Sequence, residues 1–158
     1  MAVEADVEGR KILLLTVHLE RVAGVRVSKT KIDLSWKTAL KILKHELTQE
    51  TPRTRAVKEL LAWISAHSYE DIIIAGDFNT VPFSKTIRTI NGSFKDALWP
   101  GLNYLKGSYN NLPFSIDPRI DYIFHSPELK CFAADIIGYS LGDHFPVKAV
   151  FDMRGKSL

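Results

Sequence analysis

Apolar and acidic residues alternate at the start of the chain, in the pattern of a strand with one buried face. Residues 3–7 read VEADV, and Gly9 then favours a turn. Residues 11–19 follow as KILLLTVHL, an almost continuously apolar run that is typical of a strand covered on both faces. The pattern therefore predicts a hairpin whose second strand carries His18 at its end.

Two helices are predicted next, because apolar residues recur every three or four positions. The first covers residues 36–47, with Asp33 or Ser35 as its cap. The second covers residues 52–67, with Thr51 before it and proline at its first position. The residues expected to face the core are Trp36, Leu40, Leu43 and Leu47 in the first helix and Val57, Leu60, Leu61 and Ile64 in the second, with Lys37, Lys41, Lys44 and His45 around the other side of the first.

The rest of the chain predicts strands separated by loops. Residues 83–118 are expected to form short helical or irregular pieces, because they contain pairs such as Asn91-Gly92 that favour turns. Strands are predicted over residues 71–75, 119–125, 131–139 and 147–153, with loops over 76–82 and 141–146.

Length and composition indicate one folded domain over residues 1–158, of which 46% are apolar. No run approaches the roughly 18 apolar residues of a membrane helix, and the first residues lack the pattern of a signal peptide. The single cysteine, Cys131, cannot form an internal disulfide and is expected to be a small core residue. We expect a soluble chain, cytoplasmic by default.

Charge is distributed unevenly along the chain. Residues 10–58 hold twelve Lys or Arg against four Asp or Glu, a balance of +8, and the remainder has a balance of −5. A basic surface beside an acidic one can hold an anionic substrate near metal-binding carboxylates. A solvated helix face explains the same pattern equally well.

Three polar clusters lie in or directly after predicted strands: residues 76–79 (GDFN), Asp121 and residues 142–144 (GDH). Ionised carboxylates are costly to bury unless they are paired, hydrogen-bonded or bound to metal, so the clusters suggest one site along a sheet edge. Carboxylate and amide oxygens suit Mg²⁺ or Mn²⁺, and a cation with nearby Asp, Asn and His can promote attack on an anionic phosphodiester.

Each cluster also has an ordinary structural interpretation. Residues 76–79 could form only an Asx-type turn, and Asp121 could pair with a nearby basic residue. His18 could be a satisfied core histidine, and Asp143-His144 an ordinary turn. On the residues alone, a shared catalytic site and separate structural roles stay equally open.

The order and spelling of four motifs resemble the DNase I-like endonuclease/exonuclease/phosphatase superfamily. Its members carry a Thr-His-Leu strand end, Gly-Asp-Phe-Asn, an Asp-Tyr-Ile strand and Ser-Asp-His-x-Pro-Val, in that order. The corresponding segments here are TVHL at 16–19, GDFNTVP at 76–82, RIDYIFHSP at 119–127 and GDHFPV at 142–147, which together cover nearly the whole chain.

The resemblance implies roles for the first three polar residues. His18 would contact the phosphate or help to protonate the leaving group. Asp77 would bind metal or activate the attacking water, and Asn79 would orient both Asp77 and the phosphate. The implied cofactor is Mg²⁺ or Mn²⁺.

The resemblance implies three further roles near the C-terminal motif. Asp121 would hold His144 in its working orientation, an arrangement that favours the charged imidazole. His144 would touch a phosphate oxygen, and Asp143 would be a metal ligand. Gly142 replaces the family's serine, and Thr16-Val17 replaces its Asn-Thr, but neither change removes a titrating group.

The family fold is an α+β four-layer α/β/β/α sandwich built from two similar halves, and this chain corresponds to the C-terminal half. Family members have an upstream strand with an Asn and a helix with a metal-binding Glu, which residues 1–158 lack, so we expect an N-terminally incomplete domain. A lone half would expose one sheet face, which soluble proteins seldom tolerate. We therefore expect a homodimer in which a second copy covers that face.

The resemblance implies a Mg²⁺-dependent phosphoesterase, with the fragment alone inactive. Its substrate could be nucleic acid, a phospholipid head group, an inositol phosphate or another phosphate ester. The basic segment 10–58 favours a polyanion slightly. The alternative is a non-catalytic binding or scaffold module that retains the fold, which the absent Glu favours.

Overall fold

The computed structural model describes residues 1–7, 9–21, 36–101, 103–110, 117–139 and 142–153. In chain order its elements are β1 (Ala2–Val7), β2 (Arg10–His18), α1 (Trp36–Thr48), α2 (Pro52–Ser65), β3 (Asp71–Asp77), α3 (Lys85–Asn91), β4 (Lys95–Asp96), β5 (Asp121–His125), β6 (Lys130–Ile136) and β7 (Val147–Asp152). Every predicted strand and both predicted helices are present, with boundaries shifted by up to three residues. The cap predicted at Asp33 or Ser35 and the side chain of Trp36 lie outside the described residues.

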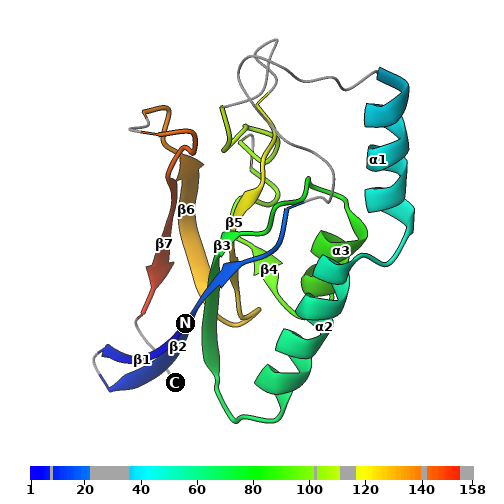
Figure 1. The fold of residues 1–158 in the computed structure, drawn as a ribbon. Helices are drawn as coiled ribbons and strands as arrows, with labels where there is room; N and C mark the ends of the chain where they lie inside the picture. The colour runs from blue at the N-terminus through cyan, green and yellow to red at the C-terminus, as the bar shows by residue number, and fades with distance from the viewer. Residues whose placement is uncertain (8, 22–35, 102, 111–116, 140–141, 154–158) are drawn as a thin grey trace.

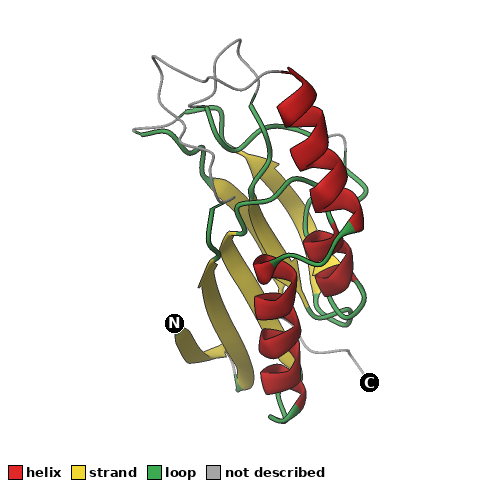
Figure 2. Ribbon diagram, turned by 45° about the vertical axis from the view of Figure 1, so that its right-hand side comes forward, coloured by secondary structure: helices red, strands yellow, loops and turns green. Residues whose placement is uncertain are grey.

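The described strands form a five-stranded mixed sheet and a separate two-stranded sheet. The larger sheet has the order β1-β2-β3-β5-β4, in which only β2 and β3 are parallel. β6 and β7 form the antiparallel pair. The helices lie on one side of the large sheet, and the β6–β7 pair lies on the other side, against β5 (Figures 1 and 2). The described chain thus has three layers.

The main core fills the space between the helices and the large sheet. Alternate residues of the strands enter it, as the two-residue period of a strand requires. Phe78, just beyond β3, is fully buried there and packs edge-on against Tyr122 and Phe124. The other buried members are Leu13, Leu15, Val57, Ile64, Ile72, Ile74, Ile87, Ile90 and Phe94.

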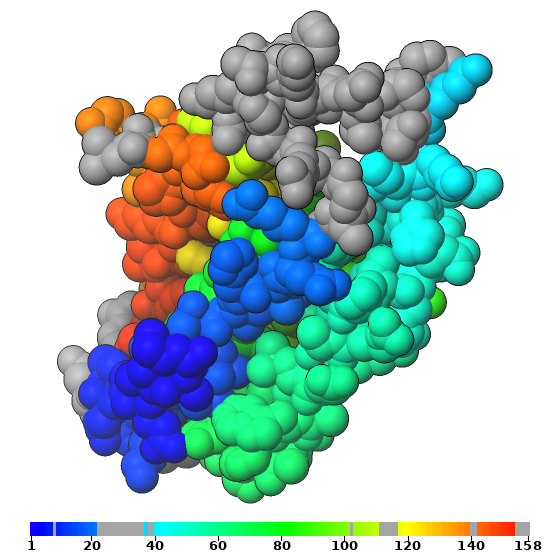
Figure 3. Space-filling model, in the orientation of Figure 1, coloured from blue at the N-terminus to red at the C-terminus, as the bar shows by residue number. Residues whose placement is uncertain are grey.

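The opposite face of the large sheet is only partly covered, which corrects the prediction of a strand buried on both faces. Leu14 of β2 is 37% exposed, and its partner Val3 of β1 is 45% exposed. β1 and β2 also lie uncovered on the near side of the space-filling view (Figure 3). The β6–β7 pair packs against β5 and does not extend over β1 and β2, so the apolar run of β2 keeps one open side.

Helix α1 presents a different face to the core from the one predicted. Leu40 and Leu43, predicted to be buried, are 54% and 41% exposed, whereas Glu46 is buried. Glu46 forms an ion pair with Arg53 of α2 and accepts a hydrogen bond from Thr80 at 2.8 Å. Buried charges require such partners, and this network orients the helix more strongly than its leucines do.

Helix α2 follows its prediction closely. Thr51 caps it by accepting a hydrogen bond from the Thr54 N–H, with proline at the first helical position. Val57 and Ile64 are buried and Leu60 and Leu61 half-buried. Cys131, expected in the core, is a half-buried free thiol. None of the helices among the described residues has the length and apolar character needed to cross a membrane.

Candidate active site and metal centre

His18, Asp77 and Asp121 form one row across three neighbouring strands. His18 of β2 is the register partner of Asp77 on β3, and Asp77 is in turn the partner of Asp121 on β5. Side chains alternate between faces along a strand, so the three point away from the helix layer, onto the partly open face. The row therefore lies at the end of the sheet where β2 and β3 finish.

Asp77 is a half-buried carboxylate at the centre of the row. Burial raises its pKa above the ordinary value of 3.8, a hydrogen bond from the backbone of Asn79 lowers it, and the charge of Asp121 raises it again. Nε2 of His18 lies 3.7 Å from Oδ2 of Asp77, and the His18 side chain is 74% exposed. The row thus combines a carboxylate that resists ionisation with an accessible imidazole.

Asn79 holds the Asp77 carboxylate from the loop after β3. Its backbone N–H donates to Asp77 Oδ1 at 2.8 Å, and its Nδ2 donates to Asp77 Oδ2 at 2.9 Å. The same Nδ2 donates to the backbone oxygen of Leu19 at 2.8 Å, which ties the end of β2 to this loop. Asn79 has a φ of 49°, a left-handed conformation that asparagine tolerates better than most residues.

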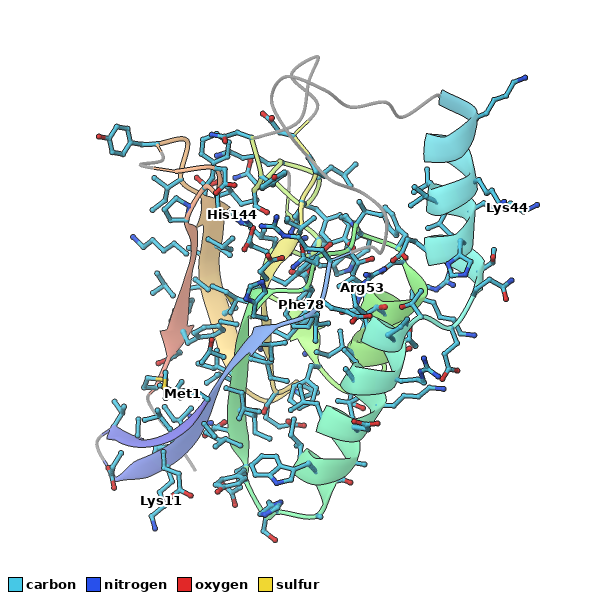
Figure 4. All side chains as sticks on the ribbon, viewed as in Figure 1. Met1, Lys11, Lys44, Arg53, Phe78 and His144 are labelled. Carbon is cyan, nitrogen blue, oxygen red and sulfur yellow. The ribbon has the colours of Figure 1, made fainter. Side chains whose placement is uncertain are left out.

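His144 is joined to the row through Asp121. Nδ1 of His144 lies 2.9 Å from Oδ2 of Asp121, and the ring meets Tyr109 edge-on with centroids 4.9 Å apart. Figure 4 shows His144 just before β7, across from the end of the large sheet. When Nδ1 donates to the carboxylate, Asp121 fixes the tautomer and the orientation of the ring.

Ser108 is a fully buried part of this arrangement that the sequence did not reveal. Its Oγ donates to Asp121 Oδ2 at 2.7 Å and accepts from the N–H groups of Ile120 and Asp121, both at 2.9 Å. Tyr109 was missed for the same reason: the segment around them reads as a turn. Only the structure shows that this loop lies against β5 and His144.

Asp77, Asp121 and His144 offer ligand atoms that lie within 4.8 Å of one another. Two carboxylates this close repel each other, and the charge of Asp121 contributes to the raised pKa of Asp77. A divalent cation would relieve that repulsion: carboxylate oxygens suit Mg²⁺ and Mn²⁺, whereas an imidazole nitrogen suits transition metals better than Mg²⁺. The two carboxylates therefore fit the cation that the family resemblance implies.

The structure brings together His18, Asp77, Asn79, Asp121 and His144, all of which the sequence singled out. Asp143, predicted as a metal ligand, is not one of the residues grouped within 4.8 Å in the described part of the chain, and its role stays a prediction. The backbone oxygen of Asp143 accepts a hydrogen bond from Asn110 at 2.9 Å.

A cavity of about 330 Å³ opens beside the row, lined by Asp121, His144 and the strand segment around Gly76. Gly76 has a φ of 148°, and a side-chain carbon there would lie 1.9 Å from the backbone oxygen of Val17. Glycine is therefore required before Asp77, where β3 passes close against β2.

The mixed sheet, its single helix layer and the carboxylate–histidine row define a DNase I-like α+β fold. The chain belongs to the Endonuclease/Exonuclease/phosphatase family, whose model matches residues 21–144. A comparison with curated proteins found no match.

Solved structures share this fold. A mannosyl-6-phosphatase of Bacteroides thetaiotaomicron is 19% identical with a TM-score of 0.58, and the match covers 92% of this chain and 52% of the phosphatase chain. D. rerio TDP2, complexed with a single strand DNA product, is 18% identical with a TM-score of 0.65, and the match covers 96% of this chain and 60% of the TDP2 chain. The human Nocturnin catalytic domain with a bound sulfate anion is 18% identical with a TM-score of 0.56, and the match covers 96% of this chain and 51% of the Nocturnin chain.

These likenesses confirm the predicted fold. The chain spans between 51% and 60% of the length of these three structures, which is compatible with one half of the four-layer sandwich. The helix layer, the large sheet and the β6–β7 pair are the parts of that half that the structure describes (Figure 1).

Proposed function

We propose that this chain supplies the active site of a divalent-metal-dependent phosphoesterase. The observation that carries the proposal is the convergence of Asp77, Asp121 and His144 within 4.8 Å at the end of the sheet. Family membership supports the same class of reaction. When bound, the cation would polarise a phosphate oxygen and lower the pKa of a water molecule.

Asp77 is proposed to orient and deprotonate the attacking water. Asn79 fixes both of its carboxylate oxygens, so the geometry is set before substrate arrives. The two hydrogens of Asn79 Nδ2 are engaged by Asp77 and Leu19. This arrangement favours an orienting role for Asn79 over direct contact with the phosphate.

His144 is proposed to bind the cation through Nε2, next to the phosphate oxygen that the cation would polarise. Asp121 holds the other ring nitrogen, and Ser108 holds Asp121. His18 is the most exposed group of the row and stands on the other side of Asp77. It is proposed to contact the phosphate or to protonate the leaving oxygen.

The class of substrate rests on weaker support than the reaction. Among known structures of this fold, one is a mannosyl-6-phosphatase and another is complexed with single strand DNA product. The basic segment is less available than its composition suggests, because Arg10 pairs with Asp71 and Arg53 pairs with Glu46. Exposed lysines of α1 such as Lys41 and Lys44 remain for a polyanion.

Hydrolysis assays test this proposal. The 158-residue chain, and a form extended to the length of its structural relatives, would be incubated with Mg²⁺ or Mn²⁺ and with bis(p-nitrophenyl) phosphate, single-stranded DNA, a phosphoinositide and a sugar phosphate. Asp77→Ala and His144→Ala should lower turnover by several orders of magnitude without loss of fold, since they remove interactions made in the transition state. An extended form that is inert on every substrate would refute the proposal.

We also propose that the isolated chain self-associates through the open face of its large sheet. Leu14 and Val3 form the exposed apolar part of that face. A second copy placed there would remove these side chains from water, which stabilises association.

A further inference from the structure

Helix α1 exposes a line of leucines to solvent. Leu40 and Leu43 are 54% and 41% exposed, and Leu47, one turn beyond Leu43, is half-buried. Spacings of three and four residues place all three on one side of the helix. The helix itself stands at the outer edge of the helix layer, beside α3 (Figure 1). Contiguous exposed apolar surface of this kind commonly marks an interaction site.

A buried acid, and not the leucines, fixes the rotation of α1. Glu46 is 5% exposed, forms an ion pair with Arg53 and accepts a hydrogen bond from Thr80. Leu40 lies six residues before Glu46, about 120° away around a helix of 3.6 residues per turn. Because the contacts of Glu46 turn its own side of the helix toward α2, the side that carries Leu40 is held outward. The exposure of the leucines is therefore built into the packing of the helix.

Two lysines lie directly beside the leucines. Lys41 and Lys44 are exposed, and Lys44 is one turn after Leu40. Neither lysine forms an ion pair with an acid among the described residues. Figure 4 shows Lys44 directed away from the rest of the chain. Lysines in such a place can keep their ammonium groups among lipid phosphates while their carbon stems follow neighbouring leucines into apolar surroundings.

The charge around this part of α1 is positive. Residues 36–58 contain six Lys or Arg against two Asp or Glu, a balance of +4. Both acids are engaged in ion pairs with two of the six cations. The surplus includes Lys41, Lys44 and, on α2, the exposed Arg55. The surface beside the leucines therefore complements an anionic partner.

A second half of the four-layer sandwich would not cover these leucines. In an α/β/β/α arrangement the two halves meet through their sheets, and the helices form the outer layers. α1 belongs to the helix layer, on the side of the large sheet opposite to the β6–β7 pair (Figure 2). A second copy on the open sheet face, at Leu14 and Val3, would also lie on the side away from α1. The leucines thus stay exposed in either assembly.

We propose that α1 docks the chain onto an anionic membrane surface. Leu40, Leu43 and Leu47 enter the boundary between head groups and acyl chains, and Lys41 and Lys44 bind lipid phosphates. Helices that lie in this boundary combine leucines on one face with lysines beside them. A nucleic acid would engage the lysines but leave the leucines in water, whereas a lipid surface accounts for both. The inference does not depend on the proposed hydrolytic function.

Cosedimentation of the chain with lipid vesicles, in EDTA so that no divalent cation contributes, tests this inference. The chain should sediment with vesicles of phosphatidylcholine and phosphatidylserine but not with vesicles of phosphatidylcholine alone. Added salt should weaken the binding, because it screens the attraction between the lysines and the anionic surface. Equal binding to the two kinds of vesicle, or binding to neither, would overturn the inference.

Substitutions on α1 test the two parts of the docking surface separately. Lys44→Gln should weaken binding about fivefold, the effect of one lysine near an anionic surface. Leu40→Ala should weaken it at least about fourfold, the effect of one buried methylene group. The matched controls are Lys11→Gln, on β2 far from α1 (Figure 4), and Phe132→Ala, an exposed apolar residue of β6. Both controls should bind as the wild type does.

The remaining outcomes identify a different occupant. Asp77→Ala should retain vesicle binding, and its loss there would place the lipid at the candidate active site and overturn the inference. Binding of single-stranded DNA that Lys44→Gln loses and Leu40→Ala keeps, without vesicle binding, would assign the lysines to nucleic acid. A dimer that Leu40→Ala converts to a monomer in light scattering, again without vesicle binding, would assign the leucines to a second copy. Either result would also overturn the inference.

Discussion

Asp77 and Asp121 are direct register partners on β3 and β5, so two carboxylates stand side by side at the end of the sheet. Their closeness helps to raise the pKa of Asp77, after the larger effect of burial. Natural sequences keep such unfavourable pairs where a ligand or a reaction uses them. The pair is therefore the feature from which the functional proposal follows.

Replacing Asp77 by Asn should separate stability from function. The folded-state pKa of Asp77 is raised above 3.8, so its contribution to stability is complete below that pH and is lost as the pH rises through the raised pKa. The asparagine of Asp77→Asn carries no charge at either pH. The melting temperature of this variant minus that of the wild type should therefore be a few degrees higher at about pH 7 than at about pH 3. Thermal unfolding at both pH values measures this difference. A relative melting temperature that falls with pH would contradict the assignment.

Ser108→Ala should affect both the fold and the site. The change leaves the N–H groups of Ile120 and Asp121 without an acceptor and removes a donor from Asp121 Oδ2. We expect a loss of about 1–3 kcal/mol in the free energy of unfolding, measured by urea denaturation. Turnover should fall with little change in KM, because Asp121 no longer fixes His144. Ser65→Ala, on the exposed end of α2, is the matched control and should change neither quantity.

The buried pair of Arg53 and Glu46 should be far more sensitive than an exposed pair. Arg53→Ala leaves Glu46 buried with one fewer partner, and we expect a loss of about 3–5 kcal/mol in the free energy of unfolding. Lys58→Ala breaks the exposed ion pair with Glu50 and should cost less than about 1 kcal/mol. Urea denaturation of both variants gives the comparison. Equal losses would show that the pair does not hold α1 against α2 and the loop at Thr80.

Self-association is tested by the molar mass of the chain in solution. Light scattering should give the mass of a dimer for the wild type, since Leu14 and Val3 are exposed on the open sheet face. Leu14→Glu should give the mass of a monomer, because a carboxylate opposes burial of that face. Phe132→Glu changes an exposed apolar residue of β6 and should leave the dimer intact. A monomeric wild type would end this proposal.

The sequence predicted most strands and α2 well because their apolar residues follow the period of a single buried face. It failed on α1, where the buried residue Glu46 is charged and its partners Arg53 and Thr80 lie elsewhere in the chain. It also overestimated the covering of β2, since an apolar run does not show whether a second layer reaches it. Pairing between distant segments decided both cases.

The residues of the candidate site were likewise predicted only in part from the sequence. Motifs identified His18, Asp77, Asn79, Asp121 and His144, and strand register brings the row together, with Gly76 and Asn79 in positive-φ conformations on either side of Asp77. Ser108 gave no recognisable signal, because a serine in a turn is common. Its position depends on how a loop packs against β5, which single-sequence patterns do not encode.

The most direct test of the central claim, that Asp77, Asp121 and His144 form one divalent-cation site, is a calorimetric titration of the chain with Mn²⁺. The wild type should bind one ion, and Asp77→Ala, Asp121→Ala and His144→Ala should each weaken binding at least about tenfold. Asp135→Ala, which removes an exposed carboxylate of β6 outside this group, should bind as the wild type does. Absence of binding in the wild type, or equal affinity in all five proteins, would contradict the claim.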